Sequence, residues 1–315
     1  MKIATSRILI AMLAVVFITG ISAKAQGPGA APATAQAPPD DSKTVIKTTK
    51  ITDNFYTLEG RGGMIGALVG PDGVLLVDTQ FAPLTDKIVA AVKQISSSPI
   101  RFVVNTHVHG DHTGGNENFG KLGAVIFARE ELRNRLMNPN PAPDGTPVKA
   151  APSVALPVVT YRGRLTFHLN GEDVEAIPIQ RAHTDGDTLV YFHNANALMT
   201  GDFYRSIGYP NIDRANGGSL NGMLDGLALV IGMSGPNTKI IPGHGPTVDR
   251  AAVIAHRDMI LGVRDRVAQL VKEGKTPEEV LAAHPTSEFD AKVPPVTGST
   301  DRFVGQLYAE LKPAK

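Results

Sequence analysis

Three histidines and one aspartate lie within six residues of the chain, in the segment 106–115 with the sequence THVHGDHTGG. Neutral imidazole nitrogens and carboxylate oxygens are ligands that Zn²⁺ binds well. If the chain stays extended, alternation points His107, His109 and Asp111 to one side. The glycines of the segment let the backbone fold tightly, so that His112 can also turn inward. The segment therefore predicts a metal site rather than a polar loop with surface histidines.

Three further candidate ligands follow at wider spacing. They are His183 in the sequence AHTDGD, Asp202 after Gly201, and His244 in the sequence PGHGP. Each lies just past a predicted strand with glycine nearby, and ligands at strand ends converge when the strands share a sheet. One of them alone is a weak signal, but with the histidine-rich segment they indicate one metal centre.

A series of strands must carry these ligands to one place. Short apolar runs predict strands at 54–58, 64–69, 74–77, 101–105, 125–127, 165–169, 174–179, 188–193 and 197–200. Apolar residues at helical spacing predict helices that begin at Pro83 and Pro277 and that span 129–137, 220–231 and 249–272. Asn170-Gly171 indicates a type I′ hairpin, and residues 138–160 a surface loop of the kind that covers a site. Strands alternating with helices indicate an α/β protein.

The four ligand-bearing segments resemble the signature of the metallo-β-lactamase superfamily, in its order: His-x-His-x-Asp-His, Ala-His-Thr, Gly-Asp and Pro-Gly-His-Gly. The resemblance runs from about Asn54 to Pro246, and it implies an αββα sandwich. It also implies a site for two Zn²⁺ or other divalent ions. One ion would be held by His107, His109 and His183, and the other by Asp111, His112 and His244. Asp202 would lie between the two ions.

The resemblance gives a further role to Asp78, which ends the apolar run 74–77. It matches an acidic position that orients the histidine-rich segment. A residue at the end of a strand can also bond to its own turn, and the sequence leaves both interpretations open.

The chemistry that such a centre implies is hydrolysis. A water between two divalent ions loses its proton near neutral pH, against a pKa of about 15.7 in bulk water. The resulting bridging hydroxide would attack a carbonyl or similar centre, with Asp111 as the proton acceptor. The superfamily's β-lactamases usually carry Cys or Ser where this chain has Asp202. The sequence thus predicts a dinuclear zinc hydrolase for an ester, thioester or lactone bond.

Two alternatives stay open at this point. One is a metallo-β-lactamase that hydrolyses β-lactam antibiotics, because those enzymes act outside the cytoplasm and this chain carries an export signal. The other is a mononuclear iron persulfide dioxygenase, which shares the fold and the signature and needs oxygen.

The first residues predict export. Lys2 and Arg7 precede an uncharged stretch from Ile8 to Ser22, and the sequence AKA at 23–25 fits a cleavage site. That stretch is shorter than the roughly 20 residues of a spanning helix, which favours a signal peptide at 1–25 over a membrane anchor. A flexible Ala/Pro-rich leader follows at 26–43, and then one hydrolase domain with C-terminal helices at 44–315. The mature protein is expected to be periplasmic or extracellular, with no membrane attachment.

Composition narrows the partners to a small-molecule substrate. The chain has no cysteine, which excludes disulfides, thiolate ligands and a Cys nucleophile. Its net charge is +1, and it has no basic run that would follow a phosphate backbone. Nucleic-acid binding is therefore not expected.

Residues around Asp202 are candidates for substrate contact. Phe203, Tyr204 and Tyr209 follow it and would either line a pocket or pack in the core. Arg205 would either bind an anionic substrate or lie in solvent, and solvent is favoured. Outside this region, Ser219 is expected to cap a helix, and the remaining histidines are expected to be structural or exposed: His168, His193, His256 and His284.

Overall fold

A computed structural model of the chain describes residues 40–142 and 144–312. The signal peptide predicted at 1–25 and most of the predicted leader at 26–43 lie outside these residues. Near the predicted start of the domain, the short 3₁₀ helix η1 (Asp41–Lys43) contacts Arg61, whose Nε donates to Asp41 over 2.7 Å. No helix within 40–142 and 144–312 is both long enough and apolar enough to cross a bilayer.

Seven strands form the first sheet, in the order β1 (Lys47–Lys50), β2 (Phe55–Glu59), β3 (Ile65–Leu68), β4 (Val74–Val77), β5 (Ile100–Val104), β6 (Val125–Arg129) and β7 (Val159–Tyr161). The pairs from β1 to β4 are antiparallel, and those from β4 to β7 are parallel. Parallel neighbours need crossover connections, and these hold the helices α1 (Thr85–Ile95), α2 (Gly110–Thr113), α3 (Asn116–Lys121) and α4 (Glu130–Met137).

Five strands form the second sheet, in the order β12 (Lys239–Ile241), β11 (Ala197–Met199), β10 (Thr188–Phe192), β9 (Glu172–Pro178) and β8 (Leu165–Leu169). Its pairs are antiparallel except β11 with β12. The hairpin between β8 and β9 turns on Asn170 and Gly171, at φ 55° and 72°, which confirms the predicted type I′ turn.

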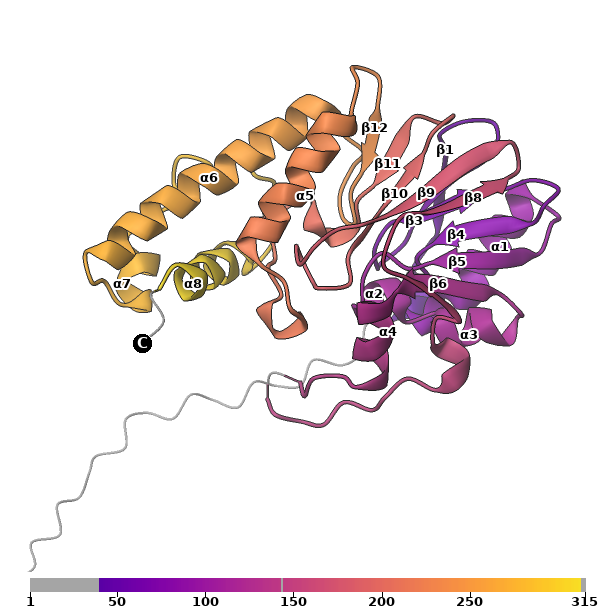
Figure 1. The fold of residues 1–315 in the computed structure, drawn as a ribbon, viewed down its shortest axis with the longest axis horizontal. Coiled ribbons are helices and arrows are strands. Elements are labelled where there is room, and N and C mark those ends of the chain that lie inside the picture. The colour runs from indigo at the N-terminus through magenta and orange to yellow at the C-terminus, as the bar shows by residue number, and fades with distance from the viewer. Residues whose placement is uncertain (1–39, 143, 313–315) are drawn as a thin grey trace, which may run out of the picture. The chain divides into compact units, whose positions relative to one another are not determined.

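Three apolar cores separate four layers. Between the sheets, Phe55 of the first and Phe192 of the second stack with ring centroids 4.0 Å apart. On the outer face of the first sheet, α1 buries Ile88 and Val92. The outer face of the second sheet is covered by the C-terminal helices, which are α5 (Leu220–Met233), α6 (Arg250–Lys272), α7 (Pro277–Ala282) and α8 (Ser299–Leu311). Figure 1 shows α5 and α6 on one side of the paired sheets and α1 on the other. The predicted αββα sandwich is confirmed.

Several elements differ from the sequence prediction, which named no strand at β12 and no helix at α2 or α3. Strand β1 is polar and mostly exposed, so it has no apolar alternation to detect. Strand β7 has three residues and lies partly within the predicted loop 138–160, which therefore ends in a strand. Helix α8 was not predicted, although Phe303, Val304 and Leu307 give it a buried face.

The interface between the sheets can be tested at Phe192, which is 0% exposed. We expect Phe192→Ala to lower the free energy of unfolding by about 3–5 kcal/mol, because it removes a fully buried ring and leaves a cavity. Chemical denaturation measures this loss. The matched control is Val158→Ala, since Val158 is 75% exposed. A loss below about 1 kcal/mol for Phe192→Ala would contradict the packing described above.

Candidate metal centre

The histidine-rich segment follows the end of β5 at Val104 and changes conformation midway. Residues 106–108 form bends, His109 is extended at φ −63° and ψ 149°, and the helix α2 begins at Gly110. The extended chain on which the alternation of His107, His109 and Asp111 depended is therefore not formed. A helical turn, rather than a strand, places Asp111 and His112. His112 is fully buried, while Asp111 keeps 25% of its side chain exposed.

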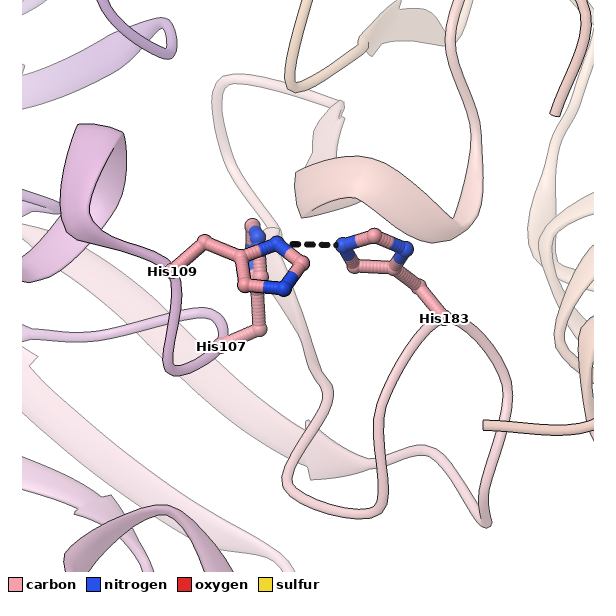
Figure 2. A group of neighbouring side chains, drawn as sticks. All are labelled: His107, His109 and His183. Carbon is pink, nitrogen blue, oxygen red and sulfur yellow. Dashed lines mark hydrogen bonds between the residues drawn. The ribbon is translucent and has the colours of Figure 1, made fainter. Parts of the chain in front are cut away.

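All seven predicted ligands come together in this structure. Their ligand atoms form three overlapping groups within which every atom lies within 4.8 Å of the others, namely His107 with His109 and His183, His107 with His112 and Asp202, and Asp111 with His112 and His244. Figure 2 shows the three rings of the first group pointing toward one another. Residues that are far apart in the sequence thus share one site at the strand ends.

The contact between His109 and His183 is informative about charge. Nδ1 of His109 lies 2.9 Å from Nε2 of His183. The opposite nitrogens are 2.7 Å from acceptors, which are Oδ2 of Asp213 for His109 and the carbonyl oxygen of Asn211 for His183. In neutral rings both outer nitrogens then carry the protons, so the two inner nitrogens present lone pairs to each other. A cation between them satisfies both.

Further atoms of the site are buried without a partner. Within the described residues, Nε2 of His107, Nε2 of His112 and Oδ1 of Asp202 make no hydrogen bond. Such atoms destabilise a folded protein unless a partner satisfies them. Imidazole nitrogens and carboxylate oxygens with their protons held elsewhere are the donor set for a divalent ion such as Zn²⁺. The residues present therefore fit a metal.

Asp78 holds the ligand segment in place. Its Oδ1 accepts from the backbone N–H of Thr106, and its Oδ2 accepts from Thr106 Oγ1 and from Nδ1 of His112, all over 2.7 Å. The carboxylate is 1% exposed. Of the two interpretations left open by the sequence, these contacts support the one in which Asp78 orients the histidines. On the other side of the His112 ring, Gly63 packs so closely that a Cβ atom at this position would clash with Cε1 of His112.

Two of the histidines are held neutral by burial. Burial lowers the pKa of His107 well below its usual value, and the neighbouring imidazoles add to this effect. Burial likewise lowers the pKa of His183 to about 4. Both rings are therefore neutral, the state that binds a metal, over the physiological range of pH.

The other half of the site attracts protons. Burial acts to lower the pKa of His112, but the carboxylates of Asp78 and Asp202 outweigh it and raise that pKa well above its usual value. The pKa of His244 is also raised, against burial, by Asp202 and Asp111. The pKa of Asp202 lies well below its usual value, because His112 and His244 outweigh the effect of burial. This half of the site therefore competes for protons more strongly than the half that contains His107 and His183.

Some residues of the site had no signal in the sequence. Asp213 and the carbonyl of Asn211 fix the rings of His109 and His183, yet neither stands beside glycine or in a recognisable motif. Their role follows from the path of one loop.

The aromatic residues after Asp202 belong to the core. Phe203, Tyr204 and Tyr209 are 1–3% exposed and pack among C-terminal helices. Packing is therefore shown for all three, and Tyr204 also borders a hollow of about 490 Å³. Ser219 caps α5 by accepting from the N–H of Gly222, as predicted. His256 is partly buried against Tyr204, while the other non-ligand histidines are exposed: His168, His193 and His284.

Comparison with known proteins places the chain in a family. The family described as the Metallo-beta-lactamase superfamily matches residues 59–244. The chain belongs to this superfamily, and its fold is the metallo-β-lactamase fold.

Curated relatives are similar over part of their length. A linear primary-alkylsulfatase of a Pseudomonas species is 21% identical over 283 residues, which are 77% of this chain and 52% of that protein. A hydroxyacylglutathione hydrolase of Nitrosococcus oceani is 31% identical over 180 residues, which are 53% of this chain and 60% of that protein. The chain thus spans little more than half the length of these relatives.

Solved structures share the fold. The DIM-1 metallo-beta-lactamase superposes with a TM-score of 0.55 at 16% identity, covering 68% of this chain and 96% of its own. The sec-alkylsulfatase Pisa1 of a Pseudomonas species superposes with a TM-score of 0.60 at 18% identity, covering 84% of this chain and 50% of its own.

The role of Asp78 can be tested by Asp78→Asn. The amide would present a donor where His112 Nδ1 donates, so the ring is driven toward the tautomer that cannot bind a metal through Nε2. We expect zinc affinity to fall about 10–100-fold, measured by competition with a chromophoric chelator. The control is Asp173→Asn, which removes an exposed carboxylate bonded to His168. Equal affinities in the two variants would refute the orienting role.

Proposed function

We propose that the protein is a metal-dependent hydrolase that holds two zinc ions and cleaves an ester, thioester or lactone bond in a small molecule. The observation that carries this proposal is the convergence of seven ligand residues in three overlapping groups. The first and third groups share no residue, and the second, which adds Asp202, shares His107 with the first and His112 with the third. That arrangement supports two ions side by side rather than one.

The proposed ligand sets follow the groups. His107, His109 and His183 would hold one ion, and Asp111, His112 and His244 the other. Asp202 would serve both, since it groups with His107 of the first set, and its Oδ1 lies 3.3 Å from Nε2 of His112 and 3.4 Å from Nε2 of His244 in the second set. When bound, such ions lower the pKa of water toward neutrality and polarise the bond under attack.

Asp111 would move the proton. Burial acts to raise its pKa, but the hydrogen bond with His244 and the charge of His112 bring it to about 2. The carboxylate is therefore ionised at neutral pH and retains some exposure to solvent. It can take a proton from the attacking water as the new carbon–oxygen bond forms, and pass it to the alcohol or thiol that leaves as the old bond breaks.

Position 202 and the relatives favour this bond type. Asp202 replaces the Cys or Ser of β-lactamases, and the chain has no cysteine at all. One relative is named for hydrolysing hydroxyacylglutathione and another for alkyl sulfates. The likeness to solved β-lactamases, at 16–20% identity, concerns the fold alone. With the export signal expected at 1–25, the activity would lie outside the cytoplasm.

Metal content and substrate range test the proposal together. We expect the purified protein to contain about two zinc ions per chain by elemental analysis. We also expect chelator-sensitive hydrolysis of an ester, a lactone or a thioester that exceeds hydrolysis of a β-lactam. His107→Ala should reduce kcat/KM by at least about 100-fold, whereas His168→Ala, at an exposed histidine, should not. One iron per chain without hydrolysis would overturn the proposal in favour of the dioxygenase.

The two metal sites should separate by pH. A ligand must lose its proton before it binds a metal. Because the pKa values of His112 and His244 are raised, the ion held by Asp111, His112 and His244 is the first to face competition from protons as the pH falls. His183 has a pKa of about 4, so protons compete with the other ion for this ligand only at lower pH.

We therefore expect zinc content to fall from about two to about one per chain between pH 8 and pH 5, measured after equilibration with a weak chelator. The ion that remains at pH 5 should be absent in His183→Ala. Loss of both ions in a single step would contradict this order.

A further inference from the structure

The outer ring nitrogen of His107 faces a hydroxyl group rather than a carboxylate or a carbonyl. Its Nδ1 lies 3.1 Å from Oγ1 of Thr106, and the residue is 1% exposed. Its Nε2 is buried and makes no hydrogen bond within the described residues, and His107 belongs to two of the three ligand groups. For Nε2 to bind a metal, the proton of the neutral ring must lie on Nδ1.

Asp78 decides the direction of the contact between Thr106 and His107. A hydroxyl has one proton, so it can either donate to an imidazole nitrogen or accept from it. Oγ1 of Thr106 also lies 2.7 Å from Oδ2 of Asp78, and a carboxylate only accepts. The proton of Thr106 is therefore directed at Asp78, and Thr106 presents a lone pair to His107. The tautomer of His107 that satisfies this lone pair carries its proton on Nδ1 and leaves Nε2 free for a metal.

The hydroxyl of Thr106 is fixed in place from several sides. The backbone N–H of Thr106 donates to Oδ1 of Asp78 over 2.7 Å. Its carbonyl oxygen accepts from the N–H of Thr188, on β10 of the second sheet, over 2.8 Å. Gly201, at φ 55°, packs so closely that a Cβ there would lie 2.8 Å from Oγ1 of Thr106. A β-branched side chain is also stiff at χ1, so the hydroxyl has little freedom to turn away from His107.

The same carboxylate oxygen serves a second histidine. Oδ2 of Asp78 accepts from Oγ1 of Thr106 and from Nδ1 of His112, each over 2.7 Å. In the proposed ligand sets, His107 belongs to one ion and His112 to the other. Asp78 is thus bonded directly to a ligand of one ion, and through Thr106 to a ligand of the other. Hydrogen bonds in such a chain polarise and strengthen one another.

We propose that Thr106 is a positioning residue that relays the carboxylate of Asp78 to His107, so that one carboxylate sets the tautomer of a ligand in each metal set. This inference rests on the proposed function, because it assigns His107 and His112 to different ions. It implies an asymmetry between two changes. Loss of the Thr106 hydroxyl weakens only the ion held by His107, His109 and His183, whereas loss of the Asp78 carboxylate weakens both ions.

Zinc affinity tests this asymmetry in Thr106→Val, which replaces the hydroxyl by a methyl group of similar size. Zinc binding to the full chain is resolved into two steps by competition with a chromophoric chelator. The step that disappears in His183→Ala identifies the ion held by His107, His109 and His183. We expect Thr106→Val to lower the affinity of that step about 10–100-fold and to leave the other step unchanged. Asp78→Asn should lower the affinity of both steps.

Two further variants separate a relay from a structural role. Thr106→Ser keeps the hydroxyl and should retain the wild-type affinity of both steps. The control Thr160→Val removes a hydroxyl that donates to Oε2 of Glu130 over 2.6 Å, and it should also leave both steps unchanged. If Thr106→Val weakens neither step or both steps equally, or if Thr106→Ser loses as much affinity as Thr106→Val, the inference is overturned and Thr106 serves the fold only.

The tautomer of His107 gives a second measurement that depends neither on metal nor on turnover. Long-range ¹H–¹⁵N NMR of the full chain, freed of metal by a chelator, shows which ring nitrogen carries the proton, and His107→Gln identifies the signals of this ring. We expect the proton on Nδ1 in the wild type and in Thr106→Ser, and a population with the proton on Nε2 in Thr106→Val. A wild-type ring protonated on Nε2 would overturn the inference even if Thr106→Val does not fold.

The outcomes separate this inference from the proposed function. A tautomer that depends on the Thr106 hydroxyl, in a protein that hydrolyses no ester, lactone or thioester, would support the relay and contradict the hydrolase. Two zinc ions with chelator-sensitive hydrolysis, and a tautomer that stays the same in Thr106→Val, would support the hydrolase and overturn the relay.

Discussion

The structure depends on holding several nitrogen and oxygen lone pairs close together in a buried site. Nε2 of His107 and His112 and Oδ1 of Asp202 lie there without a protein partner, and the inner nitrogens of His109 and His183 meet at 2.9 Å. In the absence of a cation these atoms repel or go unsatisfied. The rest of the fold must therefore supply enough stability to hold them until a metal binds.

Hydrogen bonds to the outer ring nitrogens of the histidines transmit that stability to the site. Asp78, Asp213 and the carbonyl of Asn211 each accept from a ligand histidine at 2.7 Å. These contacts select the tautomer as well as the direction of the ring. Asp78 follows strand β4 of the first sheet, and Asn211 and Asp213 lie in the loop that follows strand β11 of the second sheet. The histidines therefore adopt these tautomers only when both halves of the sandwich are assembled.

Helix α8, which lies outside the region that the superfamily match covers, also contributes hydrogen bonds around the metal centre. It packs through Phe303 and Leu307 and presents Gln306 to the loop that follows Asp202. A helix that stabilises the outer layer thereby also shapes the surroundings of the metal centre. Differences in such helices are a physical route by which one fold hosts different substrates.

The sequence by itself predicted the candidate ligands, because histidines that lie beside glycine and follow β-branched runs indicate both metal binding and the ends of strands. The layers followed from the resemblance to the superfamily. The sequence could not identify Asp213, and it left the orienting role of Asp78 open, because both roles depend on contacts across 28 to 104 residues. It also could not decide between pocket and core for Tyr204 and Tyr209. Only tertiary packing decides these points, since burial and hydrogen-bond partners are set by neighbours distant in the chain.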